Sequence, residues 1–400
     1  MKYNRRIFSF LIVSLFFIAG CRKDTMVADP ISGSDLFVSA TSSGSFTKTQ
    51  IQAFAQSAGL SAYNAYIKYD VEYFKFIYKT TYKGSQIQAS GLVGIPKNVP
   101  SAPSLLSAQH GTMFKFTDAP SNFPATFTGF ELFASGGFVT IIPDLIGFGS
   151  SQNIPHPYYD QKYSGTAVVD MIKAVKYYLS KQNIAVSNRL FLFGYSEGGY
   201  VTMATQKEIE TNVANNLTVT AAAEGAGGYD LTGMLSGIAT TASYGTPSYL
   251  ALLIKSYDST YNWNRPYSDF FQAPYASRIP TLLNGTKTGS EIDAQLTNSP
   301  TALFTTTFYN NLLSPTGETV LKQQLTANSF LTWVPKSPTR LFHGTADEAV
   351  FYQTSVNTFN RFKAAGATNV EFFTVQNGTH ESSIQPMIEN VLPWIQSLDK

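Results

Sequence analysis

The sequence is short of cysteine and of charged residues, and each shortage excludes a class of protein. Its single cysteine, Cys21, rules out a disulfide framework, so stability has to come from the size of the core. Charged residues make up only 14% of the 400. With 28 basic and 26 acidic residues, the net positive charge is too small to indicate a nucleic-acid partner. Hydrophobic residues reach 44%, which suits a large globular core and is too much for a disordered chain.

The N-terminus has the features of a bacterial lipoprotein signal. Three basic residues precede an apolar run over residues 7–19 that is too short to be a comfortable membrane span. The run ends in Ile18-Ala19-Gly20-Cys21, which resembles the lipobox in which the cysteine receives diacylglycerol. We expect residues 1–20 to be the signal peptide and Cys21 to anchor an exported protein to the outer membrane, on its periplasmic or surface face. An ordinary cleaved signal is the alternative.

A polar stretch follows the anchor, and the rest of the chain alternates strands with helices. Residues 21–45 are rich in Ser, Thr, Asp and Gly, which predicts a flexible tether. The spacing predicts a helix over 47–58, then a hairpin of strands 71–79 and 87–95 that turns at Lys83-Gly84. Further strands are expected at 104–108, 138–143, 190–193, 219–223, 339–342 and 370–375, and helices at 165–180, 198–210, 352–365 and 384–398.

Apolar strands separated by helices predict an α/β fold with a mostly parallel central sheet flanked by helices. One catalytic domain over residues 46–400 accounts for this order. More than a hundred residues separate the sixth expected strand from the seventh, too many for a bare loop. We therefore expect a helical cap, about residues 228–335, inserted after strand 6.

The chemistry is expected at one joint between a strand and a helix. The strand at 190–193 runs into Gly194-Tyr195-Ser196-Glu197-Gly198-Gly199, which matches the G-x-S-x-G nucleophile elbow in the context that this motif requires. Glycines at 194 and 198 leave room for the strand and helix to approach the strained serine. The pattern predicts Ser196 as the nucleophile.

A serine nucleophile needs a base that is oriented by an acid. His380 lies in a polar loop after the last strand, and Asp347 lies in an H-G-x-x-D-x-x-V segment after the strand before it. The order Ser, Asp, His is typical of the α/β-hydrolase fold and not of trypsin-like or subtilisin-like enzymes. Three other acids remain candidates for the place of Asp347, namely Glu348, Glu224 and Asp230.

An oxyanion hole needs two backbone amides. The residue after the nucleophile, Glu197, is expected to supply one. The loop Gln109-His110-Gly111-Thr112-Met113 is expected to supply the other from Thr112, with Met113 as the alternative and His110 as a structural residue.

These segments together resemble the secretory lipase and carboxylesterase group of the α/β-hydrolase superfamily. The segments that carry the resemblance are the runs at 89–96, 143–151 and 156–158, the His110-Gly111 loop and the Gly194 elbow. The resemblance covers roughly residues 48–400. It implies acyl-ester substrates and an active site with neither metal nor organic cofactor. Asp144, at the end of a strand, is expected to hold the glycine-rich loop that follows, with a role at the substrate rim as the alternative. Nothing in the sequence predicts an oligomeric state.

The cap region is rich in aromatic residues, which predicts a pocket for an apolar acyl chain. The alternative is that these side chains fill the core of the cap itself, leaving room for a short acyl group only. Lipase or carboxylesterase activity is expected ahead of acetyl esterase activity, a compact aminopeptidase-like hydrolase, or a non-catalytic lipoprotein. The aromatic residues concerned are Tyr244, Tyr249, Tyr257, Tyr261, Trp263, Tyr267, Phe270, Phe271 and Tyr275.

Overall fold

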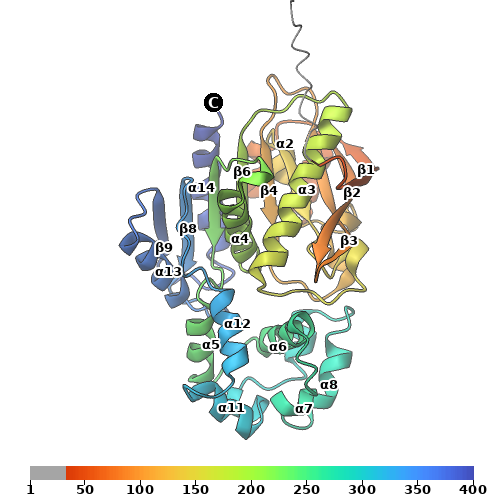
Figure 1. The fold of residues 1–400 in the computed structure, drawn as a ribbon. Coiled ribbons are helices and arrows are strands. Elements are labelled where there is room, and N and C mark those ends of the chain that lie inside the picture. The colour runs from red at the N-terminus through yellow and green to blue at the C-terminus, as the bar shows by residue number, and fades with distance from the viewer. Residues whose placement is uncertain (1–32) are drawn as a thin grey trace, which may run out of the picture.

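The computed structural model describes residues 33–400 (Figure 1). The predicted signal peptide, the Cys21 anchor and the first part of the predicted tether lie outside the described residues. None of the helices within 33–400 is both long enough and apolar enough to cross a membrane.

Within residues 33–400, nine strands form a single sheet in the order β1-β2-β3-β5-β4-β6-β7-β8-β9. Antiparallel pairing joins β1 to β2, β2 to β3 and β3 to β5, and every pair from β5 through β9 is parallel. The mostly parallel sheet expected from the sequence is therefore confirmed. The strands are β1 (Phe37–Phe46), β2 (Val71–Tyr82), β3 (Ser85–Pro96), β4 (Leu105–Gln109), β5 (Val139–Pro143), β6 (Leu190–Tyr195), β7 (Ala221–Gly225), β8 (Thr339–Gly344) and β9 (Val370–Val375).

The first strand corrects the predicted tether, which was expected to reach residue 45. Residues 37–46 instead form an edge strand that pairs with β2 along its length. Its Ser and Thr residues resemble a linker because an edge strand has one unpaired side and a half-exposed face. The strand adds one to the count, so the cap that was expected after strand 6 follows β7.

Helices cover both faces of the sheet. The face that carries α3 (Gln161–Lys181), α4 (Glu197–Thr211) and α13 (Gln353–Ala364) holds the largest apolar cluster. On the opposite face, α14 (Ile384–Leu398) packs with apolar side chains of β4, β6 and β7. The same face carries α1 (Lys48–Ser57) and α2 (Leu132–Ser135) farther along the sheet. The short 3₁₀ helices are η1 (Ser61–Tyr66), η2 (Phe116–Asp118), η3 (Pro120–Asn122), η4 (Gly149–Ser151) and η5 (Val213–Asn215).

The segment between β7 and β8 consists of helices joined by loops and extends beyond the carboxyl ends of the parallel strands (Figure 1). Its eight helices, all within the described chain, run from residue 231 to residue 327, inside the range predicted for a cap. They are α5 (Leu231–Ala239), α6 (Pro247–Tyr261), α7 (Tyr267–Phe270), α8 (Tyr275–Leu282), α9 (Gly289–Asp293), α10 (Pro300–Leu303), α11 (Thr306–Leu313) and α12 (Thr319–Ala327).

Candidate active site

Ser196 lies at a sharp turn between β6 and α4. Its backbone has φ 60° and ψ −127°, a strained conformation for a residue with a side chain. The glycines on either side permit this turn, because a Cβ on Gly194 would lie 2.1 Å from Gly198 O, and a Cβ on Gly198 would lie 2.0 Å from Gln109 O. The backbone NH of Ser196 donates to Gly225 O at 2.9 Å and ties the turn to β7.

The structure brings together the three residues that were predicted as nucleophile, base and acid. His380 Nε2 lies 2.9 Å from Ser196 Oγ, and His380 Nδ1 lies 2.7 Å from Asp347 Oδ2. Asp347 and His380 lie in loops that follow neighbouring parallel strands, Asp347 after β8 and His380 after β9. The serine hydroxyl can therefore pass its proton to an imidazole that a carboxylate orients.

The alternative acids lie elsewhere. Glu348 Oε2 accepts the backbone NH of His380 at 3.3 Å and so holds the loop, not the ring. Asp230 accepts the backbone NH of Gly233 at 3.0 Å and caps α5. Glu224 is fully buried within β7, and neither of its carboxylate oxygens has a hydrogen-bond partner among the described residues.

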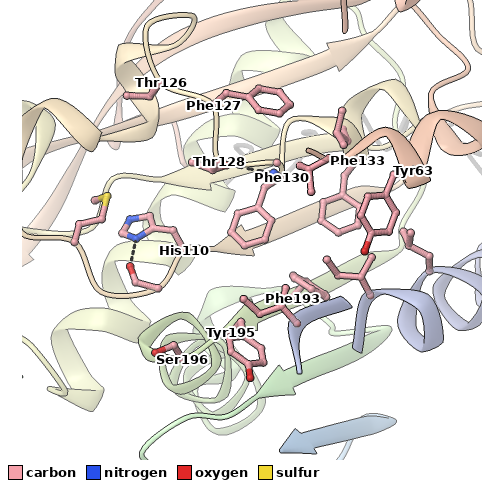
Figure 2. A pocket seen from close by; sticks show the side chains of 18 of the residues that line it. Tyr63, His110, Thr126, Phe127, Thr128, Phe130, Phe133, Phe193, Tyr195 and Ser196 are labelled. Carbon is pink, nitrogen blue, oxygen red and sulfur yellow. Dashed lines mark hydrogen bonds between the residues drawn. The ribbon is translucent and has the colours of Figure 1, made fainter. Parts of the chain in front are cut away.

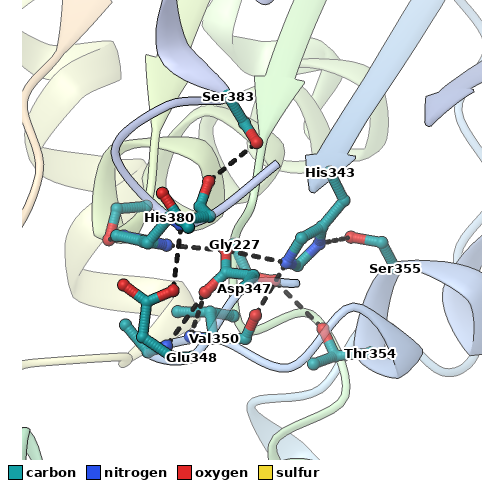
Figure 3. Close-up of polar contacts among 12 residues, drawn as sticks. Gly227, His343, Asp347, Glu348, Val350, Thr354, Ser355, His380 and Ser383 are labelled. Atoms are coloured by element: carbon teal, nitrogen blue, oxygen red, sulfur yellow. Dashed lines mark hydrogen bonds and ion pairs between the residues drawn. The ribbon is translucent and has the colours of Figure 1, made fainter. Parts of the chain in front are cut away.

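Asp347 has four nitrogen partners, which keep it ionised (Figure 3). Its Oδ1 accepts the backbone NH groups of Ala349 and Val350 at 3.0 and 2.8 Å. Its Oδ2 receives His380 and also His343, whose Nε2 lies 3.1 Å away. Burial raises the pKa of Asp347, but the hydrogen bonds from His343 and His380 outweigh it and lower that pKa to about 2. A permanent carboxylate is what a catalytic imidazolium needs as its partner.

The His380 loop is held from the elbow as well as from the acid. The Tyr195 hydroxyl donates to His380 O at 2.6 Å, and the two rings lie 5.4 Å apart. Because Tyr195 directly precedes Ser196, its hydrogen bond to the His380 backbone fixes the position of His380 relative to Ser196.

The loop predicted to complete the oxyanion hole passes beside Ser196. A Cβ on Gly111 would lie 3.5 Å from Ser196 Cβ, and the hydroxyls of Thr112 and Tyr158 are 3.0 Å apart. Within residues 33–400, no protein acceptor takes the backbone NH of Thr112 or of Glu197. The His110 ring contacts the backbone, with Nδ1 2.7 Å from Gly111 O and Nε2 3.3 Å from Asp144 O.

Asp144 holds two other segments in place. Its carboxylate accepts the Ser90 hydroxyl at 2.6 Å and the backbone NH of Ser121 at 2.8 Å. It also abuts the following loop so closely that a Cβ on Gly149 would lie 2.1 Å from its Oδ2.

A buried ion pair beside Ser196 was not predicted from the sequence. His156 Nε2 lies 2.6 Å from Glu197 Oε1, and His156 Nδ1 lies 2.6 Å from Ile146 O. Burial lowers the pKa of His156, but the Glu197 carboxylate more than offsets this and raises the pKa overall. The two residues are 41 positions apart, and no local pattern connects them.

A cavity of about 760 Å³ opens beside Ser196 and His380 (Figure 2). Its walls come mainly from η1, the segment 118–138 and α14, on the sheet face that carries α14. The prediction that cap aromatics line the pocket is wrong except for Tyr249. Side chains such as Tyr257, Phe270 and Phe271 are 0–1% exposed and pack in the apolar cluster of the cap. A cap of this size needs its own hydrophobic core, and its aromatic side chains are buried there and do not line the cavity.

The fold and the arrangement of these residues define an α/β-hydrolase. The family model for secretory lipases matches residues 130–398, which is more than half of the chain. The protein therefore belongs to the secretory lipase family and is a hydrolase that acts on esters. No curated protein matches it in sequence.

Three solved structures illustrate the likeness of fold. A candidate hydrolase from Legionella pneumophila superposes with a TM-score of 0.84 at 23% identity, covering 91% of this chain and 98% of its own. A rice cell wall degrading esterase from Xanthomonas oryzae gives a TM-score of 0.77 at 24% identity, covering 93% and 100%. Candida antarctica lipase A in its closed state gives 0.64 at 19% identity, covering 93% and 85%.

Proposed function

We propose that the protein is a serine hydrolase that cleaves carboxylic esters through an acyl-enzyme on Ser196. The observation that carries this proposal is the hydrogen-bonded line from Ser196 Oγ through the His380 ring to Asp347. No metal or organic cofactor has a step in this mechanism.

The reaction follows from that line of contacts. His380 Nε2 takes the proton of Ser196 Oγ as this oxygen attacks the ester carbonyl carbon. The backbone NH groups of Glu197 and Thr112 donate hydrogen bonds to the carbonyl oxygen and stabilise the negative charge that develops on it. The C–O bond to the alcohol then breaks and His380 gives the proton to the departing alkoxide. In the second half, His380 takes a proton from water as the water oxygen attacks the acyl carbon. The bond between that carbon and Ser196 Oγ then breaks, His380 returns the proton to Oγ, and the carboxylic acid leaves.

The helix that begins at Glu197 supports the same chemistry. The first amides of α4 have no intrahelical acceptor, and the positive end of the helix dipole lies next to Ser196. Negative charge on the tetrahedral intermediate is therefore favoured at this place.

Labelling with a fluorophosphonate probe tests the nucleophile. We expect the wild type to be labelled and to hydrolyse p-nitrophenyl esters, and Ser196→Ala to lose both while remaining folded. Ser42→Ala, on the edge strand β1 far from the elbow, is the control that keeps both. Labelling that persists in Ser196→Ala would overturn the assignment. Peptide substrates in the same assay separate an esterase from an aminopeptidase-like hydrolase.

We also propose that Cys21 carries a lipid anchor. The support is the lipobox-like Ile18-Ala19-Gly20-Cys21 after the apolar run, together with membership of a family of secretory enzymes. Diacylation plus an amide-linked chain on the cysteine supplies more than the two anchoring signals that stable membrane attachment needs. Cys21→Ser is expected to leave the membrane fraction or to remain unprocessed, and unchanged fractionation would refute lipidation.

A further inference from the structure

The cavity beside Ser196 continues along α14, away from the cap. The chain turns back after β9, and α14 leads from the His380 loop along the sheet to the C-terminus (Figure 1). The α14 residues that line the cavity are Ile384, Ile388, Leu392 and Gln396. They are spaced four apart, so they form one stripe along a single face of the helix.

The length of the cavity along α14 follows from the positions of these four residues. Twelve residues separate the first and last of them, and at about 1.5 Å per residue the stripe is roughly 18 Å long. An extended chain advances about 1.2 Å per bond, since one residue of three bonds spans about 3.5 Å. The cavity is therefore long enough for roughly 15 bonds of an extended hydrocarbon chain.

The wall that faces α14 is aromatic. Figure 2 shows Tyr63, Phe127, Phe130 and Phe133 along one side and Ser196 at one end. The ring of Phe193 packs against those of Phe130 and Phe133, at centroid distances of 5.7 and 5.3 Å, and extends the same aromatic wall. Between His380 at one end and Gln396 at the other, the α14 stripe carries only apolar side chains. Such a surface favours a hydrocarbon chain and offers few partners for the hydroxyls of a sugar.

We infer that this cavity, hereafter the α14 groove, binds the acyl chain of the substrate, and that the preferred esters carry chains of about 12 to 16 carbons. The inference rests on the proposed function and adds a binding site to it. The acyl chain lies against α14 and the segment 125–133, outside the cap.

A second cavity, of about 250 Å³ and lined partly by the cap, shares Met113 with the α14 groove. Neither Ser196 nor His380 lines it, and its walls mix apolar side chains with Gln152, Lys255 and Asn284. The α14 groove is lined by both Ser196 and His380 and is apolar along α14, so it is the cavity that we assign to the acyl chain.

Obstructing the groove at two depths tests the inference. Ile388→Trp fills its middle and Gln396→Trp fills its far end, and neither wild-type side chain is fully buried. The matched control is Gln385→Trp, an exposed position on the same helix that does not line the groove. The measurement is kcat/KM for p-nitrophenyl esters from butyrate to palmitate. Each value is divided by kcat/KM for the butyrate ester of the same variant.

The wild type is expected to favour laurate to palmitate over butyrate, because each buried methylene contributes up to roughly fourfold. Ile388→Trp should lower the palmitate-to-butyrate ratio at least tenfold and move the optimum to shorter chains. Gln396→Trp should affect only the longest chains, and Gln385→Trp should leave the ratio unchanged. A wild type that prefers butyrate, or a profile that Ile388→Trp does not alter, overturns the inference.

Two further measurements separate the alternatives. Acetate esters of alcohols of increasing length vary the other side of the bond. If Ile388→Trp shifts that series and not the acyl series, the groove holds the alcohol and the inference is wrong. Binding of a fluorescent long-chain fatty acid to Ser196→Ala, weakened by Ile388→Trp, supports the groove independently of turnover. If the protein binds the fatty acid but hydrolyses no ester, only the proposed function is overturned.

Discussion

His343 Nε2 lies 3.1 Å from Asp347 Oδ2, the same oxygen that His380 Nδ1 contacts at 2.7 Å. The His343 ring is fully buried, with Nε2 also 2.7 Å from Val350 O and Nδ1 2.6 Å from Ser355 Oγ. Because Nε2 faces two acceptors it carries the hydrogen, and Nδ1 then accepts the Ser355 hydroxyl. Asp347 thus lies between two histidines: His380, which also contacts Ser196, and His343, which does not.

Replacing His343 by Phe removes one of the donors that lower the pKa of Asp347 to about 2. A depressed carboxyl pKa stabilises the folded state above the unfolded value, near 3.9, and this stability is lost as pH falls through the folded value. We expect His343→Phe to lower the free energy of unfolding at pH 7 by about 1.5 to 3 kcal/mol. Denaturation between pH 2 and 7 should show the difference from wild type shrinking below pH 4.

Ser355→Ala is the control for this prediction, because it removes the hydrogen bond at Nδ1 and leaves the Nε2 contact with Asp347. Its effect should be smaller and independent of pH in this range. A constant difference between His343→Phe and wild type from pH 2 to 7 would mean that His343 acts through packing alone.

Asp347→Asn tests the acid in catalysis. An amide in this place offers a hydrogen where the imidazole needs an acceptor, so the ring loses the tautomer that can take the serine proton. We expect kcat to fall by about 10⁴, the size of the effect in the serine-protease precedent. Glu348→Gln, which alters only the contact with the His380 backbone, should cost far less. If Glu348→Gln or Glu224→Gln proves the more damaging change, the acid has been misassigned.

Local motifs predicted the three residues that the structure brings together, because each of them is specified by its own segment. The glycines around Ser196 and the loops after β8 and β9 are short stretches whose chemistry is visible without the fold. The ester-binding surface has no such signal. The α14 groove is assembled from residues near 63, 130 and 388, and its stripe on α14 looks like the core-facing side of any amphipathic helix.

The His156–Glu197 pair could not be predicted for a similar reason. His156 lies in a loop and Glu197 at a position of the elbow motif that any residue can occupy. Their contact depends on how the loop after β5 folds back over the start of α4. Edge strand β1 escaped prediction because its sequence has the composition of a linker.

Glu197→Gln tests the charge of that pair while keeping the backbone NH next to Ser196. A histidine whose folded pKa is raised contributes stability that is complete below the unfolded pKa, about 6.5, and lost as pH rises through the folded pKa. We expect Glu197→Gln to lower the free energy of unfolding by about 1 to 3 kcal/mol at pH 6. The loss should diminish by pH 9, as measured by urea denaturation. An equal loss at both pH values would show that the histidine is neutral in the folded protein.

Glu224 provides a test in the opposite direction, because its buried carboxyl group has no hydrogen-bond partner among the described residues. The side chain is 0% exposed, and burial raises its pKa well above the ordinary range. A carboxyl with a raised folded pKa favours folding below the unfolded value, near 4.3, and opposes it increasingly as pH rises toward the folded value. Glu224→Gln should therefore raise Tm at pH 8 and change it little at pH 4. In contrast, Glu210→Gln should lower Tm at both, because Glu210 accepts the backbone NH groups of Lys336 and Ser337. A lower Tm for Glu224→Gln at pH 8 would mean that the Glu224 carboxylate is stabilised by a partner, for which bound water is the natural candidate.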